Sequence, residues 1–316
     1  MPAHSNPIVL ITGGTGGIGQ AIAVRMAKLG ATTVIVGRDK GRGQAAIADI
    51  QAQSGGGRVE LMLADLSSQR DIRLLAAEFM SRHARLDVLI NNVGGLYGKR
   101  RETVDGIECT LALNHLCPFL LTHLLLPVLL TGAPSRIVNV NSEGHRAAET
   151  VNFGDFDAER WRRGFLIYSQ TKLANLLFTY EMARRLNPSD ITVNALHPGI
   201  VDTQLFRRFI SERFTLINGV LSKAAAFVAR KVAYRISHFD SVDAAAECPV
   251  YLASSSEVAG ITGKYFDSKK NRVETSPPSH DDALSREVWR RSAELVGLTG
   301  QVGKEMVLSQ ENADDG

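Results

Sequence analysis

The sequence predicts an α/β protein built on a doubly wound parallel sheet. Short runs of apolar and β-branched residues alternate along most of the chain with longer segments of helical periodicity. The short runs are apolar almost throughout, a pattern typical of strands that are covered by helices on both faces. Strand–helix alternation of this kind favours parallel strands joined by right-handed crossovers.

Each predicted element follows from this alternation. The strands are expected at 7–12, 32–37, 58–65, 86–92, 135–142, 191–198 and, more weakly, 263–268, and the helices near 17–30, 41–53, 68–84, 103–130, 167–187 and 241–254. Without a Pro/Ser-rich linker or an internal repeat, residues 1–298 are expected to form a single domain. Residues 203–238 stand outside the alternation and are predicted to form a helical substrate lid, and the polar tail 299–316 is predicted to be mobile.

Composition excludes several classes of function. A chain of 316 residues with 44% hydrophobic and 22% charged residues is an ordinary soluble composition. The net charge of +3 is too small to argue for nucleic-acid binding, and no Cys/His spacing suggests zinc. The N-terminus has no signal-peptide pattern, and the apolar stretch 116–130 is short and contains two prolines, so it is expected to be a buried helix. We expect a soluble cytoplasmic protein.

A glycine-rich turn, T12-G-G-T-G-G-I-G19, follows the first predicted strand. Glycines at a strand-to-helix turn allow tight backbone geometry and let a diphosphate approach the free N–H groups of the helix. A plain turn is the alternative, but the turn opens a βαβ unit, which favours a dinucleotide site. The candidate binding residues here are Gly13, Thr15, Gly17, Ile18 and Gly19.

The second strand ends in G37-R38-D39, where dinucleotide folds distinguish NAD from NADP. An acid at the tip selects the ribose of NAD, whereas an arginine receives the 2′-phosphate of NADP. Asp39 lies beyond the tip and is expected to cap the next helix, while Gly37 leaves room for a phosphate beside Arg38. NADP is therefore favoured over NAD. After the third strand, Asp65 could accept from the adenine amino group beside Leu66, or it could simply cap the following helix.

In order along the chain, these motifs resemble the short-chain dehydrogenase/reductase family with the T-G-x-x-x-G-x-G turn. The resemblance covers residues 8 to about 270 and rests on the turn, D65-L66, N91-N-V-G94, Asn114, Ser142, Y168-S-Q-T-K172 and H197-P-G-I-V-D-T203. It is strongest with the retinol dehydrogenase-like branch and implies a Rossmann-type sheet. Two positions differ from the usual family pattern, with Val93 in place of alanine and Asn141 in place of serine.

Tyr168 and Lys172 lie one helical turn apart and are the candidate proton-transfer pair. A tyrosine needs a lowered pKa to exchange protons near neutral pH, and an adjacent ammonium lowers it. Ser142, at the carboxyl end of the fifth strand, would donate a hydrogen bond to the substrate oxygen, although it could also be a turn hydroxyl. The resemblance implies that Asn114 holds a relay water and that Lys172 binds the nicotinamide ribose. Asn114 could instead be satisfied by local backbone.

The resemblance also implies that Asn91 and Gly94 line the adenosine side of the cofactor, and that Pro198, Gly199 and Thr203 surround the nicotinamide carboxamide. His145 and His197 are expected to be structural, because the tyrosine already serves as the acid/base. Glu143 is expected to be a solvated loop carboxylate.

These features together predict an NADP(H)-dependent oxidoreductase that interconverts an alcohol and its carbonyl, reducing a lipophilic aldehyde or ketone. The alternatives are an NAD-dependent alcohol dehydrogenase of the same fold and a non-catalytic dinucleotide-binding regulatory protein. The lid 203–238 is rich in aromatic and basic residues, so contact with a membrane surface is an alternative to simple pocket closure. By resemblance alone, the helices at 103–130 and 167–187 suggest a homodimer face.

Overall fold

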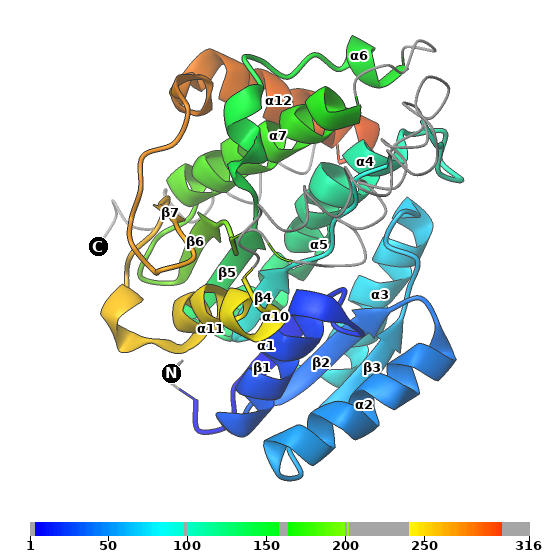
Figure 1. The fold of residues 1–316 in the computed structure, drawn as a ribbon, viewed down its shortest axis with the longest axis vertical. Helices are drawn as coiled ribbons and strands as arrows, with labels where there is room; N and C mark the ends of the chain where they lie inside the picture. Colours follow the sequence, from blue (N-terminus) through cyan, green and yellow to red (C-terminus); the bar gives the residue numbers. More distant parts are fainter. Residues whose placement is uncertain (1–3, 98–99, 158–163, 200, 202–239, 299–316) are drawn as a thin grey trace, which may run out of the picture.

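The protein contains one seven-stranded parallel sheet with the strand order β3-β2-β1-β4-β5-β6-β7 (Figure 1). The computed structural model describes residues 4–97, 100–157, 164–199, 201 and 240–298. The strands are β1 (Ile8–Thr12), β2 (Thr32–Gly37), β3 (Val59–Leu63), β4 (Val88–Asn91), β5 (Ser135–Val140), β6 (Ile191–Leu196) and β7 (Tyr265–Phe266). Every strand predicted from the sequence is present, so the doubly wound, Rossmann-type architecture is confirmed. The predicted lid 203–238 and tail 299–316 lie outside the described residues.

Helices cover both faces of the sheet, and each face has its own apolar core. One face carries α1 (Gly17–Lys28), α2 (Lys40–Ser54), α10 (Val242–Ala245) and α11 (Glu247–Ser254). The other carries α3 (Gln69–Arg82), α5 (Cys117–Thr131), α7 (Gly164–Arg185) and α12 (Asp282–Leu295). The short elements are α4 (Cys109–Leu111), the π-helical turn η1 (Ala112–Leu116), η2 (Glu143–Ala147), α6 (Gly154–Asp157), η3 (Ser256–Val258) and η4 (Pro277–His280).

The strand order reverses direction between β1 and β4, which pair with each other in parallel. In an open sheet of this kind, the carboxyl ends of the strands on either side of the reversal form a crevice in which ligands bind. The glycine-rich turn follows β1, and the loop that begins at Asn92 follows β4. The fold therefore brings the two predicted motifs to one place.

The stretch Cys109–Thr131, formed by α4, η1 and α5, is the one helical stretch among the described residues that is long and apolar enough to cross a membrane. Within its most apolar 18-residue window, 67% of the residues are buried inside the protein. Phe119, Leu120, Leu121 and Leu125 are fully buried in the core that α5 shares with α3 and α7. The sequence-based prediction of a buried helix is confirmed.

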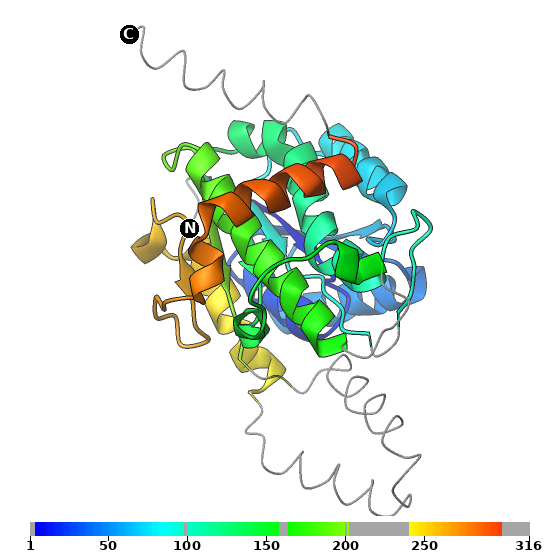
Figure 2. The same ribbon diagram turned by 90° about the horizontal axis from the view of Figure 1, so that it is seen from above.

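Helix α12 was not among the predicted elements, and it lies across α5 and α7 (Figure 2). Asp281 caps it, accepting hydrogen bonds from the backbone N–H groups of Ala283 and Leu284. Trp289 packs edge-on against Phe119, with ring centroids 5.2 Å apart. The two helices that the family resemblance suggested as a dimer face are thus contacted by a helix of the same chain.

Candidate active site

The glycine-rich turn is tied to the loop after β4 through Thr12. The Thr12 hydroxyl accepts hydrogen bonds from the backbone N–H groups of Asn92 (2.9 Å) and Val93 (3.0 Å). The Asn92 side chain donates in return to the carbonyl of Thr12 at 2.8 Å. Because these side chains satisfy each other and the local backbone, the two crevice-forming loops are held in a fixed relationship.

The glycines of this turn let a ligand approach the backbone. Gly13 and Gly17 have φ values of 66° and 55°, a region that glycine adopts without strain. A Cβ on Gly19 would lie 2.3 Å from the carbonyl oxygen of Gly13, so this position also requires glycine. Helix α1 begins after Gly16 and has no side-chain cap, which leaves its first N–H groups for an anion.

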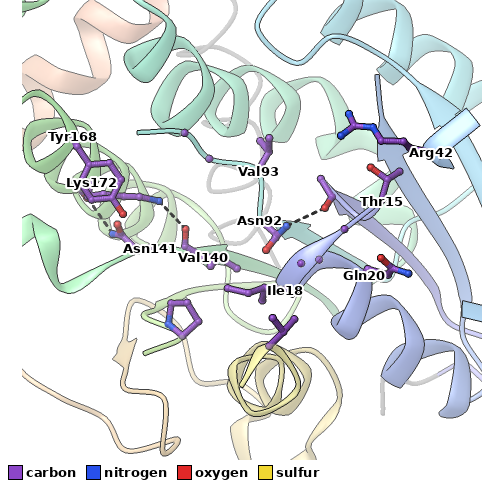
Figure 3. Close-up of a pocket in the computed structure, with 18 residues that line it drawn as sticks. Thr15, Ile18, Gln20, Arg42, Asn92, Val93, Val140, Asn141, Tyr168 and Lys172 are labelled. Atoms are coloured by element: carbon purple, nitrogen blue, oxygen red, sulfur yellow. Dashed lines mark hydrogen bonds between the residues drawn. The ribbon is translucent and has the colours of Figure 1, made fainter. Parts of the chain in front are cut away.

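A cavity of about 710 Å³ runs along this turn and reaches the catalytic candidates. Figure 3 shows Thr15 and Arg42 towards one end and Tyr168 and Lys172 towards the other. Backbone N–H groups for a diphosphate, a cation at one end and a hydroxyl at the other are the donor set that a nicotinamide dinucleotide requires. The described residues therefore fit such a cofactor.

At the adenosine end, Asp39 caps α2, and its carboxylate accepts from the backbone N–H of Arg42 at 2.8 Å. The predicted capping role is confirmed, and this bond directs the carboxylate to the helix backbone. Of the basic residues near the tip of β2, Arg42 lines the cavity while Arg38 is not among its described lining residues. Sequence reasoning missed Arg42, although its place in the first turn of the helix that Asp39 caps was a usable signal.

Tyr168 and Lys172 both come from α7 and line the cavity. The ammonium of Lys172 lies 5.8 Å from the centroid of the Tyr168 ring and donates to the carbonyl of Val140 at 3.2 Å. Burial lowers the pKa of Lys172 to about 8. Burial raises the pKa of Tyr168, and hydrogen bonding with Ser142 only opposes that rise. The expected lowering of the Tyr168 pKa is therefore wrong for the protein alone, because desolvation outweighs the hydrogen bond with Ser142.

Ser142 stands at the end of β5, beside Tyr168. A Cβ on Gly144 would lie 2.8 Å from Cε1 of Tyr168 and 3.3 Å from the Ser142 hydroxyl oxygen, so a glycine at 144 lets these side chains meet. The Ser142 hydroxyl accepts from the backbone N–H of Gly144 at 3.1 Å, and its own proton remains available to donate. Its turn role and the proposed substrate contact are thus compatible.

Asn114 lies in the π-helical turn and is 1% exposed. Its side chain accepts from the N–H of Gly95 at 2.6 Å and donates to the carbonyl of Gly95 and to the Thr171 hydroxyl, at 2.9 and 3.0 Å. These bonds hold the loop after β4 against α7. The backbone carbonyl of Asn114 cannot receive the usual hydrogen bond from four residues on, because residue 118 is proline and has no N–H.

Comparison with known proteins assigns this arrangement to a family. The short chain dehydrogenase family model matches residues 7–213. Human retinol dehydrogenase 14 is 36% identical over 308 residues, covering 92% of this chain and 86% of the relative. The chain belongs to the short-chain dehydrogenase family. Its similarity to the retinol dehydrogenases within that family is confirmed, and it is an oxidoreductase by family.

Solved structures agree with this assignment. An uncharacterised protein from Mycobacterium paratuberculosis is similar with a TM-score of 0.69 and 29% identity, covering 94% of this chain and 96% of the other. RhlG of Pseudomonas aeruginosa, solved with NADP, has a TM-score of 0.62 and 26% identity over 86% of this chain and 96% of its own.

Asp65, one of the predicted adenosine contacts of this dehydrogenase, has another local role. Asp65 does not cap α3; Ser68 does, accepting from Asp71, while Asp65 accepts from the backbone and hydroxyl of Ser67. That capping alternative is wrong because Asp65 lies three residues too early. The carboxylate is exposed, and its second oxygen has no hydrogen-bond partner among the described residues. Leu66 beside it is buried.

The side chain of Asn91 is directed into the protein interior. It donates to the Thr122 hydroxyl at 3.1 Å and to the Asn139 side chain at 2.9 Å, and it is 3% exposed. The cavity wall is formed instead by the residues that follow it, Asn92, Val93, Gly94 and Gly95. Only the backbone of Asn91 is therefore left as a route to the adenosine. Gly94 lines the cavity, but a Cβ there would lie 3.2 Å from the side-chain oxygen of Asn114 and 3.7 Å from Nζ of Lys172, so it lies beside the catalytic candidates and not on the adenosine side as predicted.

The Asn141 departure from the family pattern has a structural reason in this dehydrogenase. Its side chain donates to the carbonyl of Lys172 at 3.1 Å and accepts from the N–H of Ser142 at 3.0 Å. One side chain thus ties the end of β5 to the first half of α7. The other departure, Val93, has its side chain packed partly against the apolar core and lines the cavity.

Both His145 and His197 were predicted to be structural, and the contacts of His145 agree with this. This fully buried ring bonds the Ser142 carbonyl through Nδ1 at 2.8 Å and accepts from the N–H of Ser276 through Nε2 at 3.4 Å. His197 has Nε2 3.6 Å from a Glu143 carboxylate oxygen, and burial lowers its pKa. Glu143 is 43% exposed and also pairs with Arg146, so the prediction of a solvated loop carboxylate is confirmed.

Beyond β6, Pro198 lines the nicotinamide end of the cavity. Gly199 has a φ of 86°, and a Cβ there would lie 1.9 Å from a carboxylate oxygen of Asp240. Only glycine therefore allows the chain to turn at this point. Thr203 lies outside the described residues.

Proposed function

We propose that the protein is an NADP(H)-dependent oxidoreductase that interconverts an alcohol and its carbonyl, with Tyr168 as general acid and base. The observation that carries this proposal is the single cavity that joins the glycine-rich turn to Tyr168 and Lys172. A protein that only binds a dinucleotide has no need of a hydroxyl and an ammonium at the nicotinamide end. Reduction of a lipophilic aldehyde or ketone is the direction we favour.

The chain's own groups suit this chemistry. The bound cofactor would supply a hydride to the carbonyl carbon. Tyr168 then donates its proton to the carbonyl oxygen, while the Ser142 hydroxyl stabilises the developing alkoxide by a hydrogen bond. Lys172 stabilises the tyrosinate that remains. The carbonyl of Asn114, which lacks an N–H donor at Pro118, is suited to hold a water that returns a proton towards Lys172, because the Asn114 side chain is occupied by Gly95 and Thr171.

Preference for NADP rests on the adenosine end of the cavity. A Cβ on Gly37 would lie 2.5 Å from Cγ2 of Thr15, so glycine at the tip of β2 lets Thr15 of the glycine-rich turn pack directly over it. Arg42 lines the cavity beside Thr15, and Arg38 follows Gly37 directly. Guanidinium groups match the geometry of a phosphate, and the first acid after the tip, Asp39, is bonded to its helix.

The substrate class is drawn from two sources. The relative named retinol dehydrogenase 14 acts, by its name, on a lipophilic alcohol. In this chain, Phe165 lies one turn before Tyr168 on α7, with the rings stacked at 6.3 Å and 43% of Phe165 exposed. An exposed aromatic ring beside the acid favours an apolar substrate over a small polar one.

The test is a panel of aliphatic, aromatic and retinoid carbonyls with NADPH, and the matching alcohols with NADP⁺, followed by nicotinamide absorbance. We expect turnover of apolar members, and loss of about 10²-fold or more in kcat for Tyr168→Phe with cofactor affinity retained. If Tyr168→Phe reduces carbonyls with the kcat of the wild type, Tyr168 is not the general acid. Cofactor binding by wild type without turnover of any member would favour a regulatory protein, and better turnover with NADH would favour the NAD-dependent alternative.

A further inference from the structure

Helix α12, the last helix of the described residues, makes direct contact with the π-helical turn that carries Asn114. We propose that α12 is a working part of the active site: through His115 and Ser292 it holds this turn in the geometry that positions Asn114. His115 and Ser292 are then positioning residues for the reaction. The inference rests on the proposed function, since Asn114 matters only if the protein catalyses proton transfer.

The π-helical turn needs support from outside itself. A π-turn inside an α-helix is a rare, locally unfavourable geometry that persists where surrounding structure holds it. Here it interrupts the long helical stretch between α4 and α5. It turns the side chain of Asn114 towards Gly95 and Thr171, on the cavity side. The next residue, His115, faces α12 instead.

His115 and Ser292 form a fully buried hydrogen bond, with Nε2 of His115 2.6 Å from the Ser292 hydroxyl oxygen. The hydroxyl lies equally close, at 2.6 Å, to the carbonyl of Val288. It has only one proton, and giving this proton to Val288 leaves its oxygen free to accept from an Nε2–H. Burial lowers the pKa of His115 to about 3, so the ring is neutral.

This tautomer also explains why the other ring nitrogen of His115, Nδ1, can remain without a partner. Nδ1 of His115 is buried and has no hydrogen-bond partner among the described residues. A buried N–H without an acceptor is costly, so Nδ1 is the bare nitrogen and Nε2 carries the proton. The bond to Ser292 is therefore the one polar contact that fixes the orientation of this ring within the described part of the chain.

Aromatic packing from α12 reinforces the same segment on its C-terminal side. The ring of Trp289 lies 5.2 Å from Phe119 and 5.0 Å from His123, centroid to centroid. The Arg185 guanidinium covers the Trp289 ring at 4.3 Å. The C-terminal end of α12 is itself anchored to α3, because Gln69 and Arg73 donate to the carbonyls of Leu295 and Val296. Helix α12 thus bridges α3 and the segment that begins at the π-turn.

The experiment compares two buried serines of α12. Ser292→Ala removes the acceptor for His115, whereas Ser285→Ala removes a hydroxyl that accepts from Arg184 and donates to Leu177 of α7, away from the π-turn. His115→Leu removes the donor, and His115→Gln retains an amide N–H. For each variant of the full chain we would measure kcat and its solvent deuterium isotope effect, amide hydrogen exchange in peptides covering 109–118, and thermal unfolding.

We expect Ser292→Ala and His115→Leu to lower kcat about tenfold, as small misplacements of catalytic groups do. The solvent isotope effect should rise, exchange in 109–118 should increase, and Ser285→Ala and His115→Gln should stay near wild type. Equal behaviour of Ser292→Ala and Ser285→Ala in both kcat and exchange would overturn the inference. If Ser292→Ala does not fold, the pair His115→Leu and His115→Gln gives the same contrast. Hydrogen exchange does not require turnover, so it tests the positioning even if the proposed activity fails.

Discussion

Lys172 lies 5.8 Å from the centroid of the Tyr168 ring, yet its hydrogen bond goes to the carbonyl of Val140. The ammonium is buried and held by the end of β5, and burial lowers its pKa to about 8. The pair is therefore arranged by the fold before any ligand arrives. Lys172 can stabilise a Tyr168 tyrosinate only while it is charged. The pH dependence of the rate therefore tests this role.

We expect kcat/KM for NADPH to fall as pH rises through about 8. Lys172 then loses the charge that would bind the nicotinamide ribose and stabilise the Tyr168 tyrosinate. This ratio reports the groups of the free enzyme. Lys172→Arg, which stays charged, should move the fall to higher pH even if its overall rate is lower. A profile that is flat between pH 7 and pH 9 in the wild type would contradict the assignment.

The same shift predicts a pH-dependent contribution to stability. The folded pKa of about 8 is below the usual value of about 10.4, so between these limits the unfolded chain binds more protons. Burying the charge is unfavourable below pH 8, and this cost disappears as pH rises towards 10.4. Relative to Lys172→Met, which cannot titrate, the wild type should therefore gain unfolding free energy from pH 7.5 to pH 9.5. Urea unfolding of both proteins measures it, and a constant difference would refute it.

Arg42 should determine the preference for NADPH. Arg42→Ala should weaken NADPH binding about ten- to hundredfold and leave NADH nearly unchanged, because a charge-assisted hydrogen bond to the 2′-phosphate is lost. Lys40→Ala is the matched control, since Lys40 is an exposed cation on the same helix that is not among the described lining residues. Fluorescence titration with each nucleotide measures the affinities. Equal losses for NADPH and NADH with Arg42→Ala would show that it does not read the phosphate.

The Thr12 hydroxyl should contribute substantially to the free energy of unfolding. Thr12→Val leaves the N–H groups of Asn92 and Val93 without their acceptor, and we expect a loss of about 2 kcal/mol in unfolding free energy. Thr33→Val is the control: Thr33 is also fully buried in the sheet, but its hydroxyl has no hydrogen-bond partner among the described residues. That variant should be neutral or stabilising. Chemical denaturation of the two variants should separate them clearly, and similar losses would argue against the proposed clamp.

The sequence predicted the strands and the glycine-rich turn well because both depend on local signals. Runs of β-branched residues and a glycine cluster have the same meaning in almost any fold. The cap at Asp39 was predictable for the same reason. Of the three residues between Tyr168 and Lys172, Gln170 and Thr171 had no assigned role, because each has a partner that is distant in sequence, whereas Ser169 donates to the carbonyl of Phe165 on the same helix. Gln170 binds Asn152 and Asp155, and Thr171 binds Asn114.

Helix α12 and Arg42 show what local reasoning leaves out. Asp281 before an amphipathic segment was a readable helix start, but the value of α12 lies in Trp289 and Ser292, whose partners on α5 and η1 are more than 160 residues away. Arg42 was hidden because the tip of β2 drew attention to Arg38. In both cases the missing information was which helix face the tertiary packing turns towards the site.

Asn141 should fix the spacing between Ser142 and α7. Asn141→Ser restores the residue usual in the family but is too short to reach the carbonyl of Lys172, now 3.1 Å from the asparagine amide. Losing this buried hydrogen bond should cost about 1 kcal/mol in unfolding free energy. It should also reduce kcat more than it weakens NADPH binding, because Ser142 rather than the diphosphate cradle is displaced. Asn194→Ser is the control, since Asn194 similarly ties a strand to Ile261 and Lys264 but lies away from the cavity. Asn141→Ser could lose stability and yet keep a kcat as high as that of Asn194→Ser. That result would show that Asn141 stabilises the fold but does not position the reacting groups.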